Sequence, residues 1–278
     1  MQFSKNETIF IPDGVTAAFP RTTHLCVSAH QDDIEFMAYH AIAECFQRED
    51  AWFSACVTTD GAGSPRSGIY AKYTNDDMKN IRIKEQNKAA VVGEYAAQIQ
   101  LGYASSEVKD ATNGDVVASL AAVISACQPE VVLTHNLADK HDTHVSVALR
   151  VIAAIRSLPA ASRPKLLYGM EVWRGLDWMP DSEKVIFDAS AHPNLAAALM
   201  GVYDSQISGG KRYDAAVIGR RMANATFFES HGTDTMTEAI YAMDMTPLIE
   251  SSTAPEVFIA ERIDSMKTEI LNRVAKFD

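Results

Sequence analysis

The first 160 residues alternate short apolar segments with helix-like segments, and this pattern limits the folds that the chain can adopt. Strands are predicted at 24–29, 52–58, 97–101 and 130–134, and each is followed by a stretch with helical features. Consecutive strand–helix units are typical of a parallel sheet, because parallel strands need a long crossover between them. Right-handed crossovers would make this fold Rossmann-like.

The helices are predicted at 34–47, 76–95, 114–126 and 144–157. The second half of the chain is looser and rich in proline, with further strands predicted at 165–172 and 184–187 and a helix at 194–203. No linker rich in proline, glycine or serine separates the halves. We therefore expect a single domain, residues 1–278, of the α/β class. Its mostly parallel sheet would carry helices on both faces, with an elaborated C-terminal part.

Composition excludes several classes of function. The formal net charge of −11 disfavours binding to nucleic acid or to an anionic membrane, since both need clustered lysine and arginine. No run of 18 apolar residues is present, so we expect no membrane-spanning helix. The first residues lack the pattern of a secretory signal, and the 4 cysteines include no CxxC pair. These features predict a cytoplasmic protein with buried free thiols.

Histidines and aspartates are concentrated in two loops that follow predicted strands. His30, Asp32 and Asp33 follow the first strand, and His141 and His144 follow the fourth. Sites in open α/β sheets lie outside the carboxyl ends of the strands. A catalytic zinc takes three ligands from histidine, aspartate or glutamate and leaves a position for water. Each loop offers two such ligands three residues apart, so the loops predict a metal site, with Asp32 free to act as a base.

Each loop also has an ordinary structural explanation. Asp32 or Asp33 could cap the helix that follows, and so could Asp142 or Thr143 in the second loop. The histidines of the second loop could lie at the surface, and His135 could be either structural or part of a pocket. One loop alone leaves both explanations open, whereas two loops at matching sheet ends favour metal binding.

The two loops together resemble the LmbE/PIG-L family of zinc-dependent deacetylases. The first reads Ala-His-x-Asp-Asp after a strand, and the second carries His-x-x-His. Further similarity lies in the loop at 57–64, the Arg-x-x-Glu at 82–85 and the Ser-Gln at 205–206, so that the likeness covers residues 22–230. This resemblance implies a Rossmann-like fold and hydrolysis of N-acyl groups, mostly from sugars of the N-acetylglucosamine type.

The resemblance also implies a role for each matching residue. Three residues match the metal ligands: His30, Asp33 and His144. Asp32 would be the general base that activates water, and His141 would stabilise the oxyanion or protonate the leaving amine. Arg82 would contact the sugar. The metal would be Zn²⁺, with Fe²⁺, Mn²⁺ or Co²⁺ as alternatives, because two histidines and a carboxylate also suit non-haem iron.

Two positions depart from the family pattern. Gln31 stands where the family usually has a proline, which should loosen the turn but keep the ligands. The usual His-Pro-Asp-His is here His141-Asp142-Thr143-His144, so the aspartate is displaced by one position. A supporting carboxylate would then approach from another direction, which affects the expected tuning of His141.

The function implied is removal of an acetyl group from an N-acetylated amino sugar or its conjugate. Two alternatives stay open: an amidase of the same metal type acting on a larger thiol or glycopeptide conjugate, and a non-catalytic metal-binding protein. The expected partner is a small N-acetylated molecule, without nucleic acid or membrane, and a homo-oligomer is compatible with the resemblance. Trp173, Trp178 and Tyr203 could stack on a sugar, although core packing is the commoner role of such residues.

Overall fold

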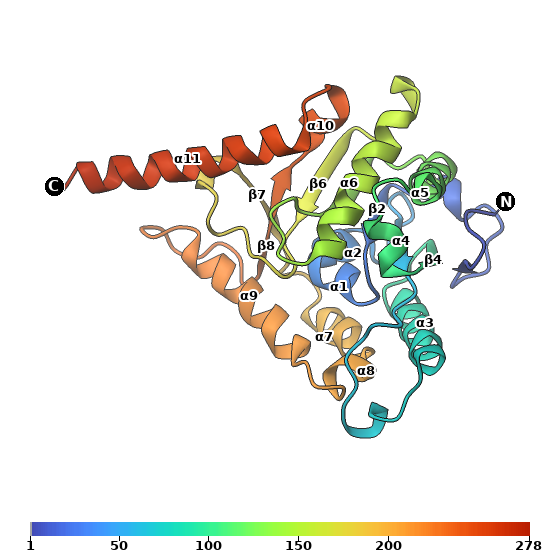
Figure 1. Ribbon diagram of the computed structural model, residues 1–278. Helices are drawn as coiled ribbons and strands as arrows, with labels where there is room; N and C mark the ends of the chain where they lie inside the picture. Colours follow the sequence, from blue (N-terminus) through green and yellow to red (C-terminus); the bar gives the residue numbers. More distant parts are fainter. Residues whose placement is uncertain (1) are drawn as a thin grey trace.

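The predicted sheet is present and contains more strands than the sequence pattern indicates. The computed structural model describes residues 2–278, and its sheet has the strand order β1-β4-β3-β2-β5-β6-β8-β7 (Figure 1). The strands are β1 (Thr8–Phe10), β2 (His24–Ser28), β3 (Phe53–Thr59), β4 (Ala97–Tyr103), β5 (Val131–His135), β6 (Leu166–Met170), β7 (Lys184–Asp188) and β8 (Ala239–Asp244). The helices are α1 (Asp33–Met37), α2 (Tyr39–Cys45), α3 (Asn75–Val92), α4 (Ser105–Lys109), α5 (Gly114–Cys127), α6 (Asp142–Ser157), α7 (Pro193–Gly201), α8 (Asp204–Ile207), α9 (Tyr213–Phe227), α10 (Thr246–Glu250) and α11 (Pro255–Ala275).

The centre of the sheet is parallel and its edges are antiparallel. Strands β4, β3, β2, β5 and β6 pair in parallel, whereas β1 is antiparallel to β4 and β8 is antiparallel to both β6 and β7. Each step between consecutive parallel strands contains at least one helix, as parallel pairing requires. The predicted α/β fold, with a mostly parallel Rossmann-like sheet and an elaborated C-terminal part, is confirmed.

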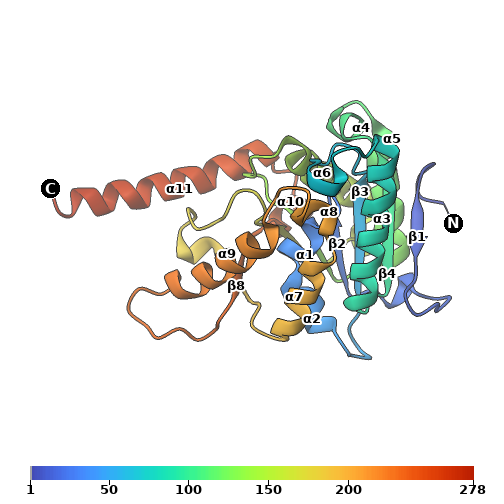
Figure 2. The same ribbon diagram turned by 90° about the horizontal axis from the view of Figure 1, so that it is seen from below.

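Helices cover both faces of this sheet because its strands are apolar on both sides. Leu25 and Val27 of β2 pack in one core cluster with residues of α5 and α6. Cys26, which points to the other face, belongs to a second cluster with residues of α1, α2, α3 and α7. Viewed from below, α3 and α7 lie along the sheet, and α11 projects away from it (Figure 2). All four cysteines are buried, as expected.

The helix predicted at 34–47 is divided into α1 and α2 at Ala38. The side chain of Arg221, on α9, donates hydrogen bonds to the backbone carbonyls of Glu35 and Phe36. In a continuous helix these carbonyls would accept from residues four positions later. A buried arginine from a remote helix therefore takes the place of two helical hydrogen bonds, which a local pattern cannot reveal.

The two central strands β2 and β5 create the position for a site. They are neighbours, but the chain leaves β2 toward β3 on one side and leaves β5 toward β6 on the other. Such a reversal opens a crevice at the carboxyl ends of the two strands. Both polar loops start at this crevice. No helix among residues 2–278 is long and apolar enough to cross a bilayer.

Candidate metal centre

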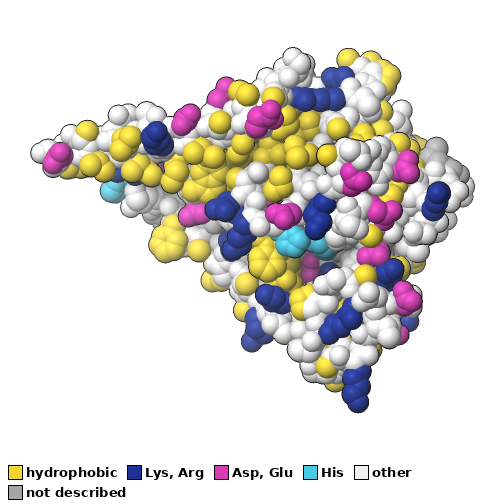
Figure 3. Space-filling model, in the orientation of Figure 1, with side chains coloured by type: hydrophobic (Ala, Val, Ile, Leu, Met, Phe, Trp, Pro, Cys, Tyr) yellow, Lys and Arg dark blue, Asp and Glu magenta, His cyan; other side chains and the backbone are white. Residues whose placement is uncertain are grey.

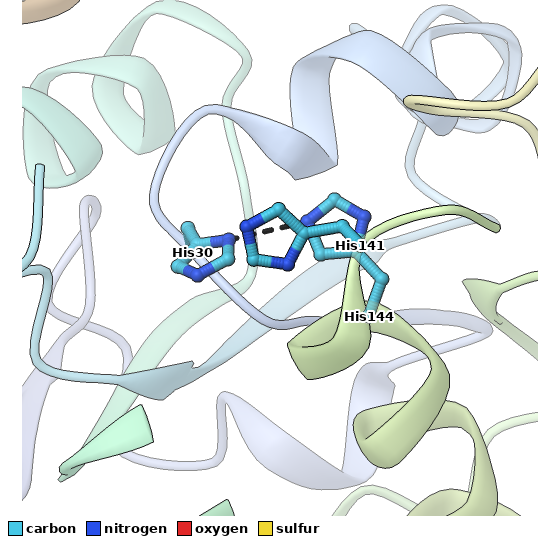
Figure 4. A group of neighbouring side chains, drawn as sticks. All are labelled: His30, His141 and His144. Carbon is cyan, nitrogen blue, oxygen red and sulfur yellow. Dashed lines mark hydrogen bonds between the residues drawn. The ribbon is translucent and has the colours of Figure 1, made fainter. Parts of the chain in front are cut away.

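Three of the predicted ligand atoms converge on one point. Nδ1 of His30 lies 3.2 Å from Oδ2 of Asp33 and 3.2 Å from Nε2 of His144. Nε2 of His144 lies 3.4 Å from the same carboxylate oxygen. Atoms that bind one tetrahedral ion at 2.0–2.1 Å are about 3.3 Å from one another. The structure therefore brings together the predicted ligands at a spacing that suits a single metal ion. Figure 4 draws two of them, His30 and His144, together with His141.

The chemistry of this donor set also fits a cation. Nδ1 of His144 lies 3.3 Å from Oδ2 of Asp139, so a proton on Nδ1 leaves Nε2 as a lone-pair donor. Burial opposes a charge on His144, but Asp33 and Asp139 more than offset it and raise its pKa. Burial likewise opposes ionisation of Asp33, yet His144 and His30 hold its pKa well below the usual value. Asp33 is therefore ionised at this centre, and a cation bound among the three donor atoms would be stabilised by its negative charge.

His135 lies close enough to share an ion with Asp33 and His144, but its lone pair is already used. Its Nε2 accepts a 2.8 Å hydrogen bond from the backbone N–H of Ala29. Burial lowers the pKa of His135 well below the usual value, so the ring is neutral and its proton lies on Nδ1. The ring stacks on that of His144, with centroids 3.9 Å apart. These contacts favour a structural role for His135, as a ring that supports His144, over a role as a metal ligand.

Asp139 is a site residue that the sequence reasoning missed. Its Oδ1 accepts from the backbone N–H of His141 at 3.0 Å, and its Oδ2 accepts from the backbone N–H of Trp173 at 3.1 Å. Asp139 also holds the ring of His144, whereas the displaced Asp142 is exposed at the first position of α6. The supporting carboxylate is thus supplied from earlier in the loop. The family spacing did not point to it.

Asp32 lies beside the three predicted ligands. Its backbone has φ of 85°, a conformation that residues other than glycine rarely adopt and that is often found at functional sites. Burial raises the pKa of Asp32 to about 8, although the guanidinium of Arg82, 3.2 Å away, favours the ionised form. In the described chain the Asp32 side chain makes no capping bond to α1, and the His141 side chain makes none to α6.

Arg82 lies on α3 and is buried, with 1% exposure. Besides its ion pair with Asp32, it donates to the backbone carbonyl of Gln31. Its Nε and Nη1 have no hydrogen-bond partner among residues 2–278, although Nη1 lies 3.9 Å from Glu85. The structure therefore places Arg82 in direct contact with Asp32, in the wall of the cavity that is expected to receive the sugar.

A cavity of about 450 Å³ opens over these residues. The predicted site residues in its wall are His30, Asp32, Asp33, Arg82 and His141. His144 is fully buried behind them. Trp173 also lines the cavity, whereas Tyr203 is buried and its hydroxyl donates to Glu35. On the surface, histidine side chains are visible beside hydrophobic side chains (Figure 3).

Replacing Gly61 with alanine is expected to destabilise the protein by about 1–3 kcal/mol, because the residue has φ of 73° and the added Cβ would strain it. That Cβ would also lie 2.6 Å from Oε1 of Gln31 and 3.1 Å from Cγ of Arg82. Denaturant titration measures the loss of unfolding free energy. Gly63→Ala, in the same loop, is the matched control because nothing lies within 4 Å of its added Cβ. Equal unfolding free energies of the two variants would contradict the prediction that position 61 requires glycine.

The comparisons with known proteins agree with this geometry. Residues 25–155 match the PIG-L family, described as GlcNAc-PI de-N-acetylase. A comparison with curated proteins found no match. Among solved structures, the N,N'-diacetylchitobiose deacetylase from Pyrococcus horikoshii is similar with a TM-score of 0.65 and 15% identity. The match covers 84% of this chain and 86% of that one.

Two further structures share the fold. The conserved protein TT1542 from Thermus thermophilus has a TM-score of 0.64 and 18% identity over 81% of this chain and 94% of that one. The 4-carboxy-2-hydroxymuconate hydratase GalB from Pseudomonas putida has a TM-score of 0.60 and 17% identity over 81% of this chain and 96% of that one. At these identities the structures establish the fold, while the family match covers both loops of the metal centre. Residues 25–155, just under half of the chain, are similar to the PIG-L (LmbE-like) family.

Proposed function

We propose that this protein is a metal-dependent deacetylase that removes the acetyl group from an N-acetylated amino sugar or its conjugate. The observation that carries the proposal is the convergence of His30, Asp33 and His144 at 3.2–3.4 Å, with an unliganded carboxylate, Asp32, in the wall of the same cavity. A purely structural metal site has no need of that additional carboxylate. The family match supports the reaction class.

His30, Asp33 and His144 would hold the ion, which we expect to be Zn²⁺, with Fe²⁺, Mn²⁺ or Co²⁺ as alternatives. When bound, the ion supplies positive charge that polarises an amide carbonyl and lowers the pKa of water. Asp139 would keep the ring of His144 oriented, as carboxylates that bond to ligand histidines generally do.

Asp32 would take the proton of the attacking water. Its carboxylate faces the cavity and is held on its other side by Arg82. A base must be ionised to act, and positive charge from both Arg82 and a bound cation favours the ionised form against the effect of burial. Arg82 would therefore act as a positioning residue for the base, in addition to the sugar contact that the family resemblance implies.

His141 would act on the carbonyl oxygen as negative charge develops there. It lines the cavity, and its Nδ1 has no hydrogen-bond partner among the described residues. Burial, together with His144 and His30, lowers its pKa, so the free side chain is neutral and donates one N–H. When the C–N bond breaks, the amine nitrogen needs a proton, which Asp32 would supply after taking it from the water; His141 would do so only in its protonated form. The products are acetate and a free amine.

Two alternatives to a sugar deacetylase are a non-catalytic metal-binding protein and an amidase acting on a larger conjugate. A non-catalytic metal protein offers no reason to keep Asp32 buried at a strained backbone position. An amidase acting on a larger conjugate would use the same ligands and base, so only substrates can separate it from a sugar deacetylase. The hydratase among the similar structures means that the fold alone does not select deacetylation.

Acetate release from a panel of N-acetylated amino sugars tests the proposal. The protein is stripped of metal with a chelator, assayed, restored with Zn²⁺ and assayed again. We expect activity to disappear on stripping and to return with about one ion per chain. Absence of acetate release from the metal-loaded protein across the panel would overturn the sugar deacetylase, and larger amides would then be tested. Activity that is indifferent to metal would overturn the mechanism.

A further inference from the structure

We infer that the substrate carries an anionic group, a carboxylate or a phosphate, and that Lys140 and Lys211 bind this group beside Trp173. The inference rests on the proposed function, because it names the substrate class of the same cavity. It concerns the part of the molecule that lies beyond the acetamide.

The two lysines come from different elements and meet at one ring. Lys140 belongs to the loop between β5 and α6, and Lys211 belongs to the segment between α8 and α9. Their Nζ atoms lie 5.9 Å and 5.3 Å from the centroid of the Trp173 ring. That ring lies 6.2 Å from the ring of His141, measured between centroids. Trp173 therefore stands between the lysines and His141, so that both ammonium groups lie one aromatic residue away from the predicted site.

Neither lysine has an ionic partner. Within residues 2–278, no carboxylate lies within the 4.0 Å limit for an ion pair of Lys140 or Lys211, or of Lys109 on the wall of the cavity. Lys79, Lys165 and Lys184 form ion pairs, whereas other lysines of the described residues, such as Lys267, do not. What distinguishes Lys140 and Lys211 is that both approach one ring in the wall of a cavity, in a chain with a net charge of −11. An anionic ligand would offset their mutual repulsion.

A second cavity provides room for the charged group. It has a volume of about 260 Å³ and shares Phe36, Trp173 and Tyr213 with the cavity of the metal centre. Lys140 lines the second cavity, and Lys211 lines the first. A substrate with its acetamide at the metal centre would therefore place a neighbouring group at the shared aromatic wall, which both lysines approach at Trp173. Dark blue side chains lie on several sides of the histidines on this face (Figure 3).

The carboxylate in the second cavity does not cancel this positive charge. Glu171 is buried, with 5% exposure, and accepts hydrogen bonds from the backbone N–H groups of Tyr241 and Leu176 and from the Asn224 amide. Burial raises its pKa, and its carboxylate oxygens are already occupied by these hydrogen bonds. Arg220, also in this wall, donates to the backbone carbonyl of Val172. Arg220 keeps its positive charge, so it adds to the positive charge that Lys140 brings to this cavity.

The test compares substrates that share the acetamide and differ in charge. The neutral member is N-acetylglucosamine, the carboxylate member is N-acetylmuramic acid, and the phosphate member is N-acetylglucosamine 1-phosphate. We expect kcat/KM for at least one anionic member to exceed that of the neutral member by about 10-fold or more, consistent with a charged hydrogen bond. The preferred member identifies the anion. The preference should shrink at high salt, because these lysines are exposed.

Variants identify the residues responsible. Lys140→Gln and Lys211→Gln are each expected to lower the anionic-to-neutral ratio of kcat/KM by about 5- to 10-fold. Lys267→Gln is the matched control, since Lys267 is an exposed lysine without an ion pair on α11, and it should keep the ratio. A ratio near one for the unaltered protein, or a ratio that both cavity variants preserve, would overturn the anion site.

Failure of the anion site and failure of the deacetylase can be distinguished. If all members are hydrolysed equally, the deacetylase stands and the anion site is overturned. If none is hydrolysed, calorimetric titration with glucosamine, muramic acid and glucosamine 1-phosphate tests the anion site without turnover. Tighter binding of an anionic compound that is weakened by Lys140→Gln and Lys211→Gln supports the site. Equal binding of the three compounds, or binding of none, overturns it.

Discussion

Replacing Asp32 with asparagine is expected to lower kcat by about 10²–10⁴-fold while the metal stays bound, because the variant loses a general base but none of the three ligands. Asparagine suits this test because it tolerates a positive φ better than alanine does, and the backbone here has φ of 85°. The substitution removes the ion pair with Arg82, so the melting temperature must be measured beside kcat.

Metal content decides how the Asp32→Asn result is read. A folded variant that contains as much metal as the unaltered protein, with strongly reduced kcat and an unchanged KM, agrees with a base acting in the transition state. A variant that keeps more than a third of kcat with metal bound would show that another group takes the proton. Loss of metal from the variant would instead place Asp32 among the ligands.

The second large effect is expected for Asp33→Ala, which should remove both metal binding and activity. Asp33 provides the carboxylate oxygen that lies 3.2 Å from His30 and 3.4 Å from His144. Changing a residue that only supports a ligand typically costs about 10–100-fold in metal affinity, so loss of a ligand should exceed that range. Metal titration measures the affinity, and acetate release measures the activity.

Thermal stability gives an independent measure of the same site. A ligand at 100 times its Kd stabilises a protein by about 2.7 kcal/mol, which corresponds to a rise of about 5 °C or more in melting temperature. Zn²⁺ should therefore raise the Tm of the unaltered protein and not that of Asp33→Ala. Asp142→Asn, an exposed change at the start of α6, should respond like the unaltered protein. An Asp33→Ala variant that still gains Tm with Zn²⁺ would contradict the proposed ligand set.

Much of the N-terminal fold could be predicted from the sequence because its signals are local. The apolar segments of β2, β3 and β5 and the helical segment of α3 were recognisable within a few residues of their ends. Beyond residue 203 the pattern did not predict α9, β8, α10 or α11. Strand β8 is antiparallel to both β6 and β7, which lie far earlier in the chain, so its place depends on long-range pairing. The division of the first helix depends on Arg221 in the same way.

The site was only partly accessible to the same reasoning. The three predicted ligands stand in two short motifs, and the structure places their side chains 3.2 Å apart for each pair with His30. The role of Asp139 was missed, since its hydrogen bond to His144 depends on how the loop folds back. The sequence left open whether His135 is structural or part of the pocket. The structure favours a structural role, because the backbone N–H of Ala29 donates a hydrogen bond to the lone pair of its Nε2. That contact connects the ends of two different strands, so a sequence motif could not predict it.

By itself the sequence determined which chemical groups stand at the carboxyl ends of β2 and β5, because alternation of strands and helices is a local property and brings both loops to one edge of the sheet. Only the tertiary structure decided how these groups are supported. Arg82 reaches Asp32 from α3, and Lys140 and Lys211 meet at Trp173 from separate loops. The physical reason is that burial, ion pairing and cavity shape depend on contacts between residues far apart in the chain. Local periodicity and motif spacing do not predict such contacts.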